Sequence, residues 1–232
     1  MKTSLPQPSH FRRTGVIVVV LLAVLVALLL GWQLRSIEHL ATGQQQRSFV
    51  VDCDFDKFRQ IMVRKNATAA IVEHTGMRLI GERIEGVVMD TSQDDRPLLN
   101  AIRGVTKTEV SAVKELMVQL ENPMLEASEL VLTQNADIHP DHIDVTTVSK
   151  GPAGRLKHYQ TTLDAKPDPE GTRVALTVAL DVLVNVPSLF KYRADAGVQQ
   201  AADDAINGQA AAIEAFIGKH AGESFILPEL MR

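Results

Sequence analysis

Apolar residues follow one pattern near the amino terminus and another beyond it. From Thr14 to Leu34 no charged residue occurs, and positions 16–30 are almost entirely Val, Ile, Leu and Ala. Helical residues rise ~1.5 Å each, so this stretch spans about 30 Å, the thickness of a bilayer's hydrocarbon core. Residues 14–34 therefore predict a transmembrane helix, with Trp32 near the headgroups. The lipid bilayer is the first partner that we expect.

The charges that flank this segment predict its orientation. The basic residues that precede it are Lys2, Arg12 and Arg13, whereas Arg35 follows it and Glu38 comes soon after. The positive-inside rule places residues 1–13 in the cytoplasm and the carboxy-terminal domain outside. A cleaved signal peptide is the alternative. We favour an uncleaved anchor because the apolar stretch is long for a signal peptide and no A-x-A-like site follows closely.

The residues after the anchor predict a tether and then mixed secondary structure. The polar run Ala41–Gln46 favours a tether over residues 35–46. Residues 49–54 favour a strand, and residues 55–74 favour helix, capped by an aspartate and broken near Asn66 into two short helices. Gly76 closes this helical region.

A series of strands is predicted next. Residues 77–91 alternate as a strand would, with Gly81 and Gly86 as candidate bulges. Residues 106–120 fit either a helix or a strand. We choose strand, because a hairpin across Asn122-Pro123 would also explain the alternation at 130–138. Turn residues separate three further strands, at 143–149, 156–165 and 172–186. Pro187 ends the last strand, and a long helix follows over 188–218.

The order strand, two short helices, six strands and a long final helix resembles the START-like or SRPBCC superfamily. The resemblance covers residues 47–218, and residues 219–232 remain as a tail. It implies an α+β helix-grip domain, in which a curved antiparallel sheet surrounds the carboxy-terminal helix. It also implies a cavity between sheet and helix for a hydrophobic ligand. The residues that we assign to this cavity are His158, Glu82, Ile206, Gln209, Ile213 and Phe216.

Composition narrows the classes of function. Residues 36–232 hold 20 basic and 28 acidic residues, a formal charge of −8. Such a domain has no net field that attracts phosphate backbones, so we do not expect nucleic-acid binding. Cys53 is the one cysteine, which excludes an intramolecular disulfide. We interpret it as a small apolar residue at a strand end, since the adjacent acids would raise its pKa. Because the domain has no structural disulfides, we expect the extracytoplasmic compartment to be the periplasm.

Three groups of residues suggest chemistry, and each has a plainer interpretation. His139-Pro140-Asp141-His142 has the composition of a zinc site but the pattern of an exposed turn, which we favour. His158 has the chemistry of a general base, and a hydrogen-bonded surface histidine is the plainer interpretation. Glu82 and Glu85 fall on opposite strand faces, so they cannot act as a pair. We expect no cofactor and no metal.

Three hypotheses about function remain. The first is a membrane-tethered extracytoplasmic module that binds a hydrophobic small molecule or lipid. The second is a structural protein with a filled core that contacts an envelope protein. The third is an enzyme of the cyclase or hydratase type that uses His158 or Glu82. No catalytic motif in the sequence favours the third.

Overall fold

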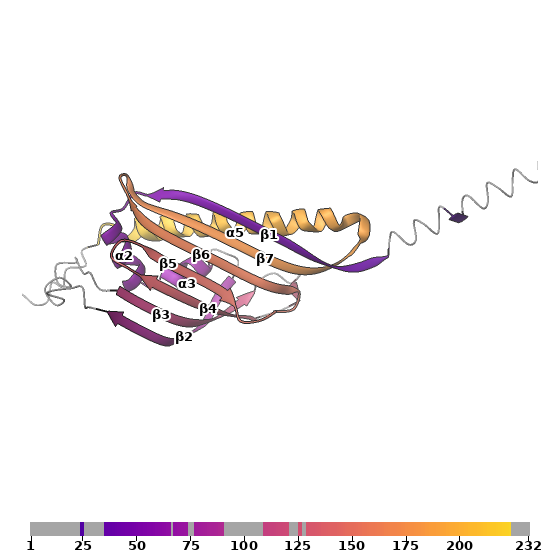
Figure 1. Cartoon of the computed structure of the whole chain (residues 1–232), viewed down its shortest axis with the longest axis horizontal. Helices are drawn as coiled ribbons and strands as arrows, with labels where there is room; N and C mark the ends of the chain where they lie inside the picture. The colour runs from indigo at the N-terminus through magenta and orange to yellow at the C-terminus, as the bar shows by residue number, and fades with distance from the viewer. Residues whose placement is uncertain are drawn as a thin grey trace, which may run out of the picture.

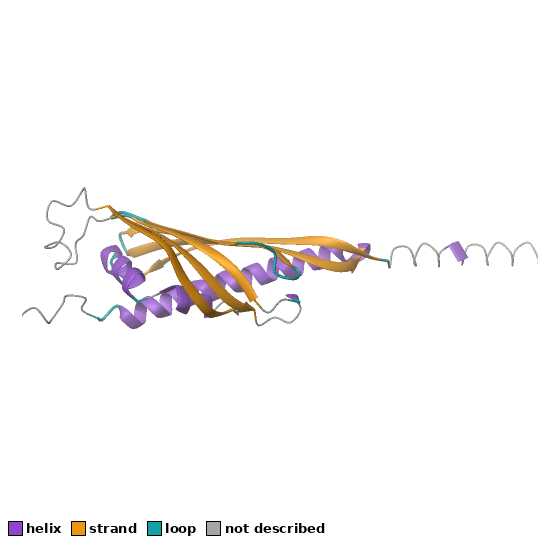
Figure 2. Cartoon of the chain, turned by 90° about the horizontal axis from the view of Figure 1, so that it is seen from below, coloured by secondary structure: helices purple, strands orange, loops and turns teal. Residues whose placement is uncertain are grey.

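The computed structural model describes residues 24–25, 35–65, 67–73, 77–90, 109–120, 125–126 and 129–223. In this part of the chain, seven strands form an antiparallel sheet in the order β1-β7-β6-β5-β4-β3-β2. The sheet curves around a long carboxy-terminal helix, α5 (Figures 1 and 2). This is the helix-grip arrangement that the element order predicts.

The elements have the following bounds. The strands are β1 (Ser36–Val51), β2 (Met77–Asp90), β3 (Glu109–Leu120), β4 (Glu129–Ile138), β5 (Ile143–Ser149), β6 (Leu156–Asp168) and β7 (Gly171–Pro187). The helices are α2 (Phe55–Arg64), α3 (Ala67–Glu73), the 3₁₀ turn η2 (Ser188–Phe190) and α5 (Lys191–His220). The order and type of these elements match the sequence prediction from the first helix onward.

Strand β1 is the main correction to the sequence prediction. Residues 41–46 do not form a tether, because the whole of β1 pairs with β7 from Ser36↔Pro187 to Val51↔Thr172. The run looks polar because β1 is an edge strand with one face in solvent. Its inward positions are the small residues Ala41 and Gly43, which are buried against α5.

Helix α5 approaches the backbone of β1 very closely at Gly43. A Cβ atom added there would lie 2.5 Å from the carbonyl oxygen of Val198, so only glycine allows the contact. Beside it, the Gln199 side chain donates a hydrogen bond to the Gln44 carbonyl (2.8 Å) and accepts one from the Gln44 N–H (3.2 Å). The helix therefore satisfies backbone groups that an edge strand would otherwise leave unpaired.

The short helices follow their sequence signals. The Asp54 carboxylate accepts a hydrogen bond from the N–H of Asp56 at 2.9 Å and caps the start of α2, as predicted. The chain breaks into α2 and α3 at the predicted place, although Asn66 itself lies outside the described residues. Phe58 and Ile61 on α2 are fully buried in the core.

Strands β2, β3 and β4 confirm the choice of strand over helix. Strand β3 pairs with β2 on one side and β4 on the other. The register of β2 shifts between Leu79 and Gly81 and again between Ile84 and Gly86, so both predicted bulges are present. Extra residues of this kind increase the local twist and bend the strand.

The carboxy-terminal tail begins later than predicted. Residues 219–220 still belong to α5, and Glu223 is tied to the body of the domain. The Glu223 carboxylate lies 2.7 Å from the Lys65 ammonium and 2.6 Å from the His220 ring. Residues 224–232 lie outside the described part of the chain.

The predicted transmembrane segment also lies outside the described residues, apart from Val24 and Leu25, which are helical and exposed. The Asn122-Pro123 turn lies outside them as well. Among the residues that the structure describes, no helix combines the length and hydropathy that a membrane crossing requires.

We expect Gly43→Ala to destabilise the domain because the added methyl would force β1 and α5 apart. The melting temperature and the denaturant midpoint of the full chain both measure this effect. Gly197→Ala, on the exposed side of α5 with no atom within 4 Å of the new methyl, is the matched control. It should be neutral or stabilising by about 0.5–1 kcal/mol, the usual gain from replacing a helical glycine. Equal melting temperatures for Gly43→Ala and wild type would contradict the close-approach argument.

The Glu223 contacts predict a pH dependence. Hydrogen bonds from Lys65 and His220 lower the pKa of Glu223 to about 2 from 4.5. Because the folded-state pKa is the lower one, the contact stabilises the fold above the unfolded-state pKa, and this is lost as pH falls toward 2. Glu223→Gln should therefore lower the melting temperature near neutral pH and converge on wild type in strong acid. Glu214→Gln, which removes one exposed charge from α5, is the control. Its melting temperature should equal that of wild type both near neutral pH and in strong acid.

Candidate ligand-binding cavity

A cavity of about 320 Å³ lies between the concave face of the sheet and helices α3 and α5. Its walls come from α2, α3, strands β2 to β7 and the second half of α5. Ile84, Val87 and Met89 of β2 line it and are each about half exposed or more, so the cavity opens along β2. The apolar lining includes Met62, Ile71, Val72, Leu116, Leu132, Ile143, Leu163, Leu176 and Ile213. The site is therefore mainly a hydrophobic chamber with one open side.

One group of polar residues crosses the chamber in a chain of hydrogen bonds. The Thr68 hydroxyl on α3 donates to the Gln134 side-chain oxygen at 3.0 Å. The Gln134 amide nitrogen then donates to the Thr147 hydroxyl at 3.2 Å. This chain connects α3 to β4 and β5, and it holds the helix over the sheet. Gln134 is thereby oriented with both ends of its amide in use.

A second polar pair, Tyr159 on β6 and Gln209 on α5, lies deep in the chamber. Each is 5% exposed, and the Gln209 amide donates to the Tyr159 hydroxyl oxygen at 3.3 Å. Burial raises the pKa of Tyr159 well above its ordinary value, so the phenol keeps its proton. Among the described residues, none accepts that proton in a hydrogen bond. The hydroxyl is thus a buried donor at the wall of an apolar cavity.

A charged pair borders the cavity. Lys114 of β3 lines the cavity, and its ammonium group lies 2.7 Å from the Glu82 carboxylate of β2. The two side chains share the same partial exposure, 23%. Glu82 is therefore on the cavity face, as the sequence analysis placed it. It contacts Lys114, which lines the cavity, but it does not line the cavity itself. The pair carries no net charge.

The other predicted cavity residues divide into two groups. Gln209 and Ile213 line the cavity. Ile206 is buried in the core between α5 and the sheet, and Phe216 packs edge-on against His220. Neither residue is among those that line the cavity. His158 also lies outside the lining. Its neighbour Tyr159 points inward, and because side chains alternate along a strand, His158 points to the outer face, near Gln160.

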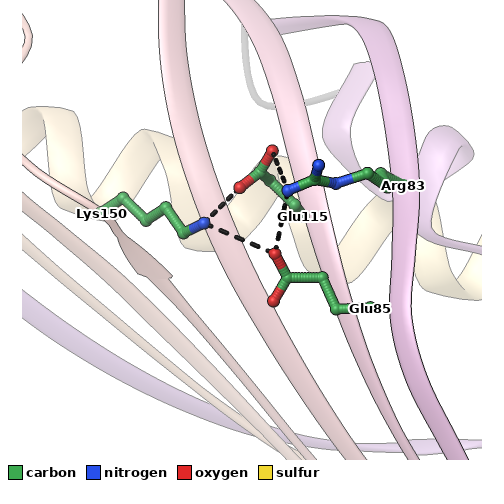
Figure 3. Close-up of polar contacts among 4 residues, drawn as sticks. All are labelled: Arg83, Glu85, Glu115 and Lys150. Carbon is green, nitrogen blue, oxygen red and sulfur yellow. Dashed lines mark hydrogen bonds and ion pairs between the residues drawn. The ribbon is translucent and has the colours of Figure 1, made fainter.

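The outer face of the sheet carries a cluster of four charged side chains (Figure 3). Arg83 lies 3.2 Å from Glu85 and 3.4 Å from Glu115, and Lys150 lies 3.6 Å from Glu85 and also pairs with Glu115. The hydrogen bond from Lys150 lowers the pKa of Glu115, and the same contact raises that of Lys150. Two cations and two anions thus compensate each other and connect β2, β3 and the end of β5. Glu85 lies on the face opposite Glu82, as predicted.

The remaining candidate residues have structural surroundings. His139 and His142 stack with ring centroids 4.3 Å apart in the β4–β5 turn, which confirms the predicted turn. The His142 ring lies 2.8 Å from Asp141. Cys53 is a buried free thiol, and burial followed by the Asp54 charge raises its pKa. A thiol in this state is a poor nucleophile.

Sequence reasoning missed most of the polar residues of the cavity. Tyr159, Gln134 and Lys114 all stand on strands at positions that alternate with outward-facing residues. The available signal was the polar residue on an otherwise apolar face, as with Gln134 between Leu132 and Ala136. Alternation assigns such a residue to the inner face, but only the structure shows a space beside it.

No protein-family model matches the chain, and no curated protein matches it. Several solved structures are partly similar. The protein TTHA0849 from Thermus thermophilus is 10% identical, with a TM-score of 0.44, over 78% of this chain and 99% of that one. Ara h 8.0201 is 11% identical (TM-score 0.43; 77% and 99%). The Zhui aromatase/cyclase from Streptomyces sp. R1128 is 13% identical (TM-score 0.42; 79% and 99%). The strand order and the position of α5 in this chain are themselves those of a helix-grip fold.

Proposed function

We propose that this protein is a binding module that holds a hydrophobic small molecule or lipid in the cavity beneath α5. One observation carries the proposal, namely a chamber of about 320 Å³ with a mainly apolar lining on the concave side of the sheet. Folded domains contain few voids larger than a water molecule, whereas ligand pockets begin near ~300 Å³. The volume of the chamber together with its apolar lining supports a ligand.

The lining defines the chemistry of the ligand. Most of the walls are aliphatic, so the ligand presents an apolar body. The Tyr159 hydroxyl offers one buried donor, which fits a carbonyl, ester or ether oxygen. The Lys114–Glu82 pair is internally neutralised and gives a free anion no net attraction. We therefore propose an uncharged amphiphile with an acceptor group at its buried end.

The module is proposed to act at a membrane. Residues 14–34 supply the anchor by sequence pattern, and the positive-inside bias supports a domain on the extracytoplasmic side, in the periplasm. Strand β1 begins at Ser36, so the domain would start almost directly at the end of that segment. The enzyme hypothesis loses its proposed residues here, because His158 lies on the outer face and Glu82 is engaged by Lys114.

Photo-crosslinking in vesicles tests ligand binding. The full chain, reconstituted in vesicles, is irradiated with a medium-chain fatty ester that carries a diazirine, and labelled peptides are identified by mass spectrometry. We expect labels on β4 and on α5 near Gln209, in addition to labels on residues 14–34 from the bilayer. Ala136→Phe projects a phenyl ring into the cavity and should reduce the cavity labels at least tenfold. The labels on residues 14–34 should not change.

Asn135→Phe is the matched control because Asn135 adjoins Ala136 on the same strand and faces outward. It should label as wild type does. A wild-type chain labelled only at residues 14–34 would rule out the binding proposal in favour of a filled structural domain. Equal cavity labelling in wild type and Ala136→Phe would show that the ester does not bind in this chamber.

The Tyr159–Gln209 pair gives a separate prediction. Tyr159→Phe leaves the buried Gln209 amide without its partner, which should cost about 1–3 kcal/mol of unfolding free energy. Replacing both residues, as Tyr159→Phe with Gln209→Met, removes both polar groups and should restore most of that stability. Both variants should lose crosslinking of the ester relative to a diazirine-bearing alkane of equal length. Denaturant titration and the crosslinking ratio are the two measurements, and an unchanged ratio would count against Tyr159 as a ligand donor.

A further inference from the structure

The turn between β7 and α5 exposes large apolar side chains. We call residues 187–193 the tip. Leu189 is 55% exposed, Phe190 43% and Tyr192 84%. Phe190 and Tyr192 are two of the few aromatic residues in a chain with 4% aromatics. Three exposed apolar residues within four positions, two of them aromatic, favour a contact surface over a solvent-facing turn.

The tip lies beside the start of β1. Pro187 pairs with Ser36 in the sheet, and the His39 ring lies 2.7 Å from Asp195 near the start of α5. Figure 1 shows the start of β1 and the start of α5 at the same end of the molecule. The tip is therefore located where the chain enters the domain from the predicted anchor.

The distance between anchor and tip is short. Only Arg35 separates Leu34, the last residue of the predicted transmembrane segment, from Ser36. Two extended residues reach at most about 7 Å, and paired strands lie about 5 Å apart. A domain attached this way cannot move its tip far from the bilayer surface.

The charges of the tip fit a lipid headgroup region. Residues 187–193 contain Lys191 and Arg193 and no acid. Arg35 adds a third cation at the same end. Acids lie nearby on α5 and β1. Asp195 is paired with His39 and, with Asp203, lines a groove beside Tyr192, and Glu38 is on β1. Aromatic residues flanked by cations are the side chains that favour the membrane interface, since their rings are amphipathic and the cations meet lipid phosphates.

We infer that the tip enters the headgroup region of the membrane that the anchor crosses, with Leu189, Phe190 and Tyr192 inserted and Lys191 and Arg193 on lipid phosphates. This inference rests on the anchor in the proposed function. It gives the domain a second attachment to the bilayer and fixes which end faces the lipid. The opposite end of the sheet, at the β6–β7 turn, then points away, about 50 Å along β1 at ~3.3 Å per residue.

Depth-dependent quenching tests the tip. Leu189→Cys and Glu170→Cys are labelled with the fluorophore NBD in the full chain, placed at one copy per nanodisc of phosphatidylcholine and phosphatidylglycerol. Glu170 lies in the exposed β6–β7 turn and is the matched control. Wild type treated in the same way corrects for the buried Cys53. We expect a blue-shifted emission at position 189 and at least twofold quenching by lipids with a spin label high on the acyl chain. Neither effect should occur at position 170.

Two further arms separate the possible outcomes. Lys191→Glu with Arg193→Glu should reduce quenching at position 189 by half or more in discs with phosphatidylglycerol. A blue shift that requires two copies per disc, without lipid quenching, would assign the tip to a second copy of the chain and overturn the inference. In vesicle flotation, a chain that stays at the bottom overturns the anchor and the tip together. A chain that floats with an unquenched label at position 189 overturns the tip alone.

Discussion

The contact between α5 and the backbone of β1 determines the geometry of this domain. Strand β1 is an edge strand, and its backbone at Gln44 is satisfied by the side chain of Gln199 rather than by another strand. Gly43 allows this because it has no Cβ to hold the helix away. With one side of α5 fixed to β1 and β7, the sheet beyond β6 curves away from the helix. The cavity occupies the space that this curvature leaves.

The same arrangement explains why the polar groups of the cavity are few and paired. A hydrophobic chamber tolerates a buried polar atom only when it has a partner, since an unpaired one costs about 1–3 kcal/mol. Gln134 meets this requirement through Thr68 and Thr147, and Lys114 through Glu82. Tyr159 meets it only in part, since its oxygen accepts from Gln209 while its proton has no acceptor among the described residues. The hydroxyl proton of Tyr159, which a ligand could accept, is the most specific feature of the chamber.

Sequence patterns predicted the elements whose signals are local. The Asp54 cap, the break between α2 and α3 and the bulges at Gly81 and Gly86 all depend on neighbouring residues, and all are present. The first half of β1 was missed because its signal is not local. Ala41 and Gly43 are small because a helix about 155 residues away packs against them, and their polar neighbours face solvent. The cavity was predicted from a family resemblance, but most of its polar residues were not, since alternation identifies an inner face without showing whether that face is packed.

The length of α5 relates the two proposed sites. Gln209 in the cavity lies 18 residues beyond Lys191 at the tip, which corresponds to about 27 Å along a helix. If the tip contacts lipid and α5 stands upright, the cavity lies beyond the headgroup layer, and its opening along β2 faces the surrounding solution rather than the acyl chains. A ligand would then reach the chamber from the aqueous phase. If α5 instead lies along the surface, β2 and the opening can reach the lipid directly. The composition of α5 favours the upright arrangement, because a helix lying flat on the bilayer would need an apolar stripe along its whole outer side. The outer side of α5 carries Gln200, Asp203 and Asp204, which belong in water.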